Sequence, residues 1–96
     1  MVLDQIKNKN IYVYGCGQFL FKIIGKICKI ATITNIIDDN TCYLNKSIKN
    51  IEIINYDMLK NQIKDNDTIL LVTKIHDATI KEKLLKLNIK LNIITI

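Results

Sequence analysis

The sequence contains no arginine, proline or tryptophan, and it has one histidine and three glycines among 96 residues. Arginine is the side chain that most often reads nucleic-acid bases in a bidentate manner. Its absence argues against a nucleic-acid partner, despite a formal net charge of +5. The lysines are scattered at helical spacing, so we expect them to lie on solvated helix faces.

The three cysteines, Cys16, Cys28 and Cys42, form no Cys-x-x-Cys pair, which argues against a metal site. An odd number of cysteines without an apparent signal peptide is typical of reduced thiols in the cytosol. No stretch has the composition of a membrane-spanning helix. We therefore predict a soluble, cytoplasmic protein with neither a membrane span nor a metal.

Apolar runs that alternate with amphipathic segments predict an α/β fold. Strands are predicted over Ile11–Tyr14, Ile30–Ile37, Ile51–Ile54, Thr68–Thr73 and Leu91–Ile96. Helices are predicted over Gly17–Lys29, after an N-cap at Asn55 or Asp57, and after a capping box formed by Thr79 and Glu82. Residues 38–50 have the composition of a loop.

A helix lies between successive predicted strands, so the strands are expected to run parallel. The simplest arrangement is a three-layer open sheet of five strands in the order 3-2-1-4-5, with the short third strand at an edge. We expect residues 1–96 to form one domain, and we do not expect a chain of this size to build a large active-site cleft alone. We expect it to be a fragment of a larger protein, with further domains elsewhere.

The first strand stops at Gly15-Cys16-Gly17-Gln18 and passes into the first predicted helix. Such a glycine turn presents backbone N–H groups to an anionic ligand at a helix N-terminus. Leu20 stands where a dinucleotide-binding turn has its third glycine, which favours a mononucleotide or a nucleotide sugar. Alternatively, the two glycines make only a strand-to-helix turn.

Asp38 and Asp39 end the second strand, where an acidic residue meets a ribose or base in such sheets. The alternative is a solvated turn. Lys74 and His76 follow the fourth strand at the same edge and are candidate phosphate contacts. Alternatively, His76 is a proton carrier, or only a loop or capping residue. A helix dipole can activate a thiol such as that of Cys16, but no histidine is near it in sequence, so no catalytic residue is assigned.

Three segments carry a resemblance to a known family. They are Tyr14–Phe19, Ile36–Asn40 and Ser47–Ile54. Together they resemble the Rossmann-like nucleotide-sugar-binding module of bacterial glycan biosynthesis proteins. This module forms the N-terminal domain of left-handed β-helix sugar acyltransferases and the C-terminal domain of sugar C-methyltransferases.

The resemblance implies that Gly15 and Gly17 face phosphate and that Asp38 or Asp39 contacts the nucleoside. No hexapeptide repeats follow, so the acyl-CoA site of the acyltransferases has no counterpart in this sequence. The resemblance therefore implies a binding role and no catalytic one.

The sequence thus predicts recognition of a small-molecule nucleotide or nucleotide sugar, such as a UDP-sugar, within a sugar-modifying or glycan-biosynthesis enzyme. Whether the isolated chain is itself an enzyme stays open. One alternative is a ligand-free interaction or dimerisation module, in which unpaired strand edges form a homo-oligomer. Another is an NAD-binding domain of a dehydrogenase-like or redox-sensing protein.

Overall fold

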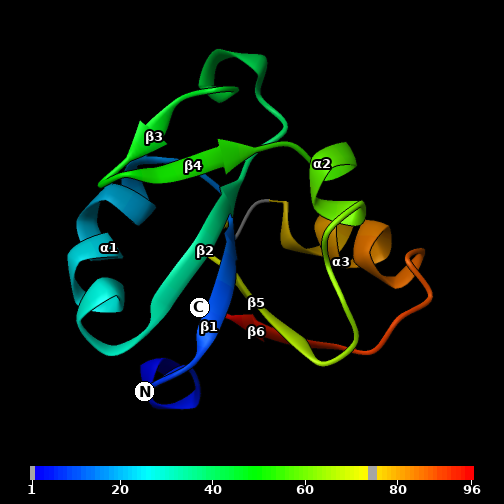
Figure 1. Cartoon of the computed structure of the whole chain (residues 1–96), viewed down its shortest axis with the longest axis horizontal. Helices are drawn as coiled ribbons and strands as arrows, with labels where there is room; N and C mark the ends of the chain where they lie inside the picture. The colour runs from blue at the N-terminus through cyan, green and yellow to red at the C-terminus, as the bar shows by residue number, and fades with distance from the viewer. Residues whose placement is uncertain (1, 74–75) are drawn as a thin grey trace.

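A computed structural model describes residues 2–73 and 76–96 of the chain (Figure 1). Its strands are β1 (Asn10–Tyr14), β2 (Thr32–Ile37), β3 (Ser47–Ile48), β4 (Ile51–Ile54), β5 (Asp67–Leu71) and β6 (Leu91–Thr95). Its helices are α1 (Gln18–Ile30), α2 (Tyr56–Lys60) and α3 (Asp77–Leu85), with short 3-10 helices η1 (Val2–Gln5) and η2 (Thr41–Tyr43). The predicted α/β class is confirmed.

The strands form one sheet in the order β3-β4-β2-β1-β5-β6. All neighbouring pairs are parallel except β3 and β4. The prediction of five strands, with Ile51–Ile54 at an edge, is wrong because β3 covers that edge. Lys49 and Asn50 join β3 to β4 with φ angles of 50° and 65°, the left-handed conformation that a two-residue hairpin turn requires.

Helices cover both faces of the sheet, with α1 on one side and α2 and α3 on the other (Figure 1). Successive residues of β1 point to opposite faces, so Ile11 and Val13 join the core beneath α1. Tyr12 and Tyr14 join the core beneath α2 and α3. The central strand is therefore buried on both faces, and its carboxyl end leads directly into the turn before α1.

Several element boundaries differ from the predicted ones, among them the end of β5, which lies at Leu71 and not at Thr73. Ile30 ends α1 and does not begin β2, because its side chain continues the apolar face of the helix. The capping box at Thr79 is wrong, because α3 already begins at Asp77 with His76 as its N-cap. The predicted cap at Asn55 is confirmed, since its side chain accepts a hydrogen bond from the Met58 N–H at 2.9 Å.

Among residues 2–73 and 76–96, no helix combines the length and the apolar character that a bilayer crossing requires.

Candidate functional site

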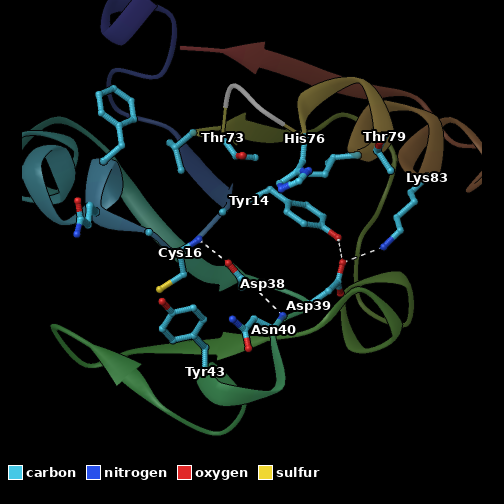
Figure 2. Close-up of a pocket in the computed structure, with 16 residues that line it drawn as sticks. Tyr14, Cys16, Asp38, Asp39, Asn40, Tyr43, Thr73, His76, Thr79 and Lys83 are labelled. Carbon is cyan, nitrogen blue, oxygen red and sulfur yellow. Dashed lines mark hydrogen bonds and ion pairs between the residues drawn. The ribbon is translucent and has the colours of Figure 1, made fainter.

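A pocket of about 780 Å³ opens at the carboxyl ends of β1, β2 and β5, beside the N-termini of α1 and α3 (Figure 2). This volume lies within the range of small-molecule sites. The lining residues are Tyr14, Gly15, Cys16, Gly17, Gln18, Phe19, Asp38, Asp39, Asn40, Tyr43, Val72, Thr73, His76, Thr79, Ile80 and Lys83. The structure thus brings together every described residue that the sequence proposed for binding. Lys74 lies outside the described residues.

Gly15 and Gly17 have different reasons to be glycine. Gly15 has a φ of +113°, and a Cβ there would lie 3.2 Å from a methyl group of Val72 and 3.3 Å from the Cβ of Thr73. Its backbone conformation is one that residues with a side chain rarely adopt, and a Cβ would require Val72 and Thr73 to shift by a few tenths of an ångström. Gly17 is extended, with a φ of −144°, and a Cβ there would have no atom of the described residues within 4 Å apart from its chain neighbours. At Gly17 the absent side chain leaves open space at the pocket wall.

The N-terminus of α1 faces this space without a side-chain cap. The carbonyl of Gly17 accepts the first helical hydrogen bond, from the Phe21 N–H at 3.2 Å. Within the described part of the chain, the N–H groups of Gly17, Gln18 and Phe19 have no acceptor. Free N–H groups at a helix N-terminus carry partial positive charge and can bind an anion.

Asp38 ties the glycine turn to the end of β2. Its Oδ2 accepts a hydrogen bond from the Cys16 N–H at 2.8 Å, and its Oδ1 accepts one from the Asn40 N–H at 2.8 Å. A carboxylate has about four lone-pair positions, so Asp38 can still accept from a ligand hydroxyl or N–H. Its existing bonds hold it against the pocket.

Asp39, which follows β2, connects this strand end to β1, α2 and α3. Its Oδ2 accepts from the Tyr14 hydroxyl at 2.7 Å and from Lys83 Nζ at 2.9 Å (Figure 2). Its Oδ1 accepts from the Tyr56 N–H at 2.9 Å. Burial alone would raise the pKa of Asp39, but these three donors outweigh it and hold the pKa below its ordinary value. Burial, and then the bond to Asp39, raise the pKa of Tyr14.

Cys16 is 4% exposed and belongs to the core beneath α1. Burial, and next the charge of Asp38, raise the pKa of its thiol. Because a raised pKa favours the protonated thiol, Cys16 lacks the character of an activated nucleophile. Its contribution to the site is its backbone N–H, which fixes Asp38.

On the opposite wall, His76 is exposed and lines the pocket with Thr73 and Thr79 (Figure 2). His76 occupies the N-cap of α3 without a side-chain capping bond. No group of three His, Cys, Asp or Glu side chains within the described ranges is arranged to hold a metal ion. Hydroxyl and imidazole groups at this wall can donate to or accept from a ligand.

Sequence reasoning missed Lys83 and Tyr43. Lys83 follows Thr79 by four residues and His76 by seven, so helical periodicity places all three on one face of α3. That signal is present in the sequence. Tyr43 lies in η2, within a segment that has no period, and only the folded loop brings it to the pocket.

Comparisons of the chain with models of protein families and with curated proteins give no match.

Proposed function

We propose that this domain binds a nucleotide or nucleotide sugar at the pocket and serves as the recognition part of a sugar-modifying or glycan-biosynthesis enzyme. The observation that carries the proposal is the open space above Gly17 beside uncapped N–H groups of α1. A phosphate placed there accepts from the N–H groups of Gly17 and Gln18. The resemblance of the glycine turn and of the Asp-Asp-Asn strand end to the glycan-biosynthesis module supports the same assignment.

Asp38 is the better placed of the two carboxylates to accept from a ribose or a base. It has two protein donors, whereas Asp39 has three. Leu20 favours a mononucleotide or a nucleotide sugar over NAD. It is fully buried between α1 and the sheet, where a dinucleotide-binding turn uses glycine to bring the helix close to the strand.

The proposal is tested by substituting Gly17→Asp and measuring thermal unfolding with UDP-glucose, GDP-mannose, AMP and NAD. At a hundred times its dissociation constant, a ligand adds about 2.7 kcal/mol to the stability of the wild type, a shift on the order of 10 °C. An aspartate at the N-cap of α1 stabilises the free protein by a few tenths of a kcal/mol and repels phosphate. We expect a slightly higher melting temperature without ligand and no ligand shift.

Gly25→Asp is the matched control, because it makes the same change on an exposed part of the same helix, where a Cβ meets no atom within 4 Å. This variant should keep the full ligand shift. A wild type that none of the four compounds stabilises would favour the interaction module. Equal shifts in the wild type and Gly17→Asp would place the ligand away from α1.

A further inference from the structure

Lys83 brings a positive charge into the pocket from α3. Its Nζ lies 2.9 Å from Asp39 Oδ2 and 5.3 Å from the centroid of the Tyr56 ring. The side chain is 40% exposed. A carboxylate and an aromatic face therefore hold the ammonium group, on a side chain that lines the pocket and is partly exposed.

Lys83 can contact a ligand without leaving Asp39 unpaired. A lysine ammonium has three N–H donors, and Asp39 is the hydrogen-bond acceptor for Lys83 in the described part of the chain. Asp39 also accepts from the Tyr14 hydroxyl and the Tyr56 N–H. A ligand anion that draws Lys83 toward itself therefore leaves this carboxylate with two donors, and the large cost of an isolated charge does not arise.

Lys83 lies away from the phosphate position at α1. Figure 2 shows Cys16 and Lys83 on opposite sides of the pocket, with Asp38 and Asp39 between them. A phosphate that accepts from the α1 N–H groups is thus on the other side of the acidic residues from Lys83. The two donor sets are suited to two different groups of one ligand.

We propose that Lys83 binds a second anionic group of the ligand, either a second phosphate or the carboxylate of an acidic sugar. This inference rests on the proposed nucleotide site and specifies which ligands the site prefers, namely those with a second anionic group. Asp39 is then a positioning residue, which holds the Lys83 ammonium at the pocket wall and does not itself bind the ligand.

The test is isothermal titration of the wild type, Lys83→Met and Lys83→Arg. The ligands are the mono- and diphosphates of uridine, guanosine and adenosine, together with UDP-glucose and UDP-glucuronate. We expect Lys83→Met to lower the affinity for the diphosphate or for UDP-glucuronate at least tenfold more than the affinity for the matching monophosphate. Lys83→Arg keeps the positive charge and should therefore retain more affinity for these ligands than Lys83→Met.

Lys60→Met is the matched control. Lys60 also lies over the Tyr56 ring, at 5.9 Å, but it does not line the pocket, and its removal changes the net charge equally. Melting curves without ligand check that each variant is folded. Lys83 is partly exposed, so its truncation opens no core cavity.

Each outcome decides a different point. An equal loss of affinity for UDP and UDP-glucose would identify the second phosphate as the group that Lys83 binds. A loss of affinity for UDP-glucuronate alone would identify the sugar carboxylate. If Lys83→Met leaves the affinity for every ligand unchanged, or lowers the affinity for the monophosphates as much as that for the diphosphates and UDP-glucuronate, the inference is overturned while the nucleotide site stands. If the wild type binds none of these compounds, the proposed function fails and the inference fails with it.

Discussion

At the scale of single residues, two adjacent carboxylates, Asp38 and Asp39, organise the pocket through different hydrogen bonds. Asp38 fixes the glycine turn through the Cys16 N–H, and Asp39 gathers donors from β1, α2 and α3. When the folded state lowers the pKa of such a carboxylate, part of its contribution to stability is present only while it is charged. The stability of the domain should therefore depend on pH through Asp39.

The pH prediction concerns Asp39→Asn. The folded-state pKa of Asp39 is lowered, so its contribution is present above the ordinary value of about 4 and is lost as the pH falls through the folded-state pKa. At pH 7 the variant should be about 1–2 kcal/mol less stable, allowing for solvent screening of a partly exposed group. In urea unfolding, the gap to the wild type should stay constant from pH 7 to 5 and close between pH 4 and 2.

Asp57→Asn serves as the control for this pH dependence. Asp57 is exposed and pairs with Lys60 on the surface of α2 at 3.3 Å, a contact worth little. Its substitution should leave the free energy of unfolding nearly unchanged at pH 7. If the gap for Asp39→Asn stayed constant down to pH 2, the three donors around Asp39 would not be acting on its charged form.

At the scale of elements, glycine has opposite effects on stability at two places. It is required in the connection from β1 to α1, and it is unfavourable in the middle of α1. Gly15 has a backbone conformation that residues with a side chain rarely adopt, and a Cβ added there would lie close to Val72 and Thr73. Gly25 lies on the exposed face of α1 with no atom within 4 Å of a Cβ. A glycine inside a helix costs conformational entropy that alanine does not.

Alanine should therefore have opposite effects at these two glycines. We expect Gly15→Ala to lower the free energy of unfolding by about 2 kcal/mol or more. Gly25→Ala should raise it by about 0.5–1 kcal/mol. Urea unfolding monitored by circular dichroism measures both. A neutral Gly15→Ala would mean that the turn relaxes into an ordinary conformation.

The sequence identified the long elements because their apolar residues repeat with a clear period. The five predicted strands keep their predicted order in the sheet, and strand ends placed Gly15 and Asp38 at one edge. The β3 strand was missed because two residues show no period, and its turn uses Lys49 and Asn50 in place of the usual Asn-Gly pair. Lys83 was missed although its four-residue spacing from Thr79 is visible in the sequence, because only the packing of α3 against the sheet places that face at the pocket.

At the scale of the whole molecule, one sheet separates two apolar cores that share the same strands. Tyr14 and Cys16 are two residues apart in the chain, yet Tyr14 is buried beneath α2 and α3, and Cys16 beneath α1. Because β1 contributes to both cores, loss of either core uncovers one face of a strand that the other core also requires. The domain should therefore unfold as one cooperative unit.

This cooperativity can be measured with one probe on each face. In a Cys28→Ser/Cys42→Ser/Tyr43→Phe background, Cys16 is the only thiol, and the remaining tyrosines all belong to the core beneath α2 and α3. Pulsed thiol labelling and tyrosine fluorescence should give the same urea midpoint.

Leu20→Ala beneath α1 and Leu84→Ala beneath α3 each truncate an almost fully buried side chain, and each should cost about 2–5 kcal/mol. In a single cooperative unit, each substitution shifts the midpoints of both probes together, although each lies on one face. If Leu20→Ala moved the midpoint for Cys16 and left that for the tyrosines unchanged, the two cores would be separate folding units. The pocket at the end of β1 would then lie at a boundary that can open without global unfolding.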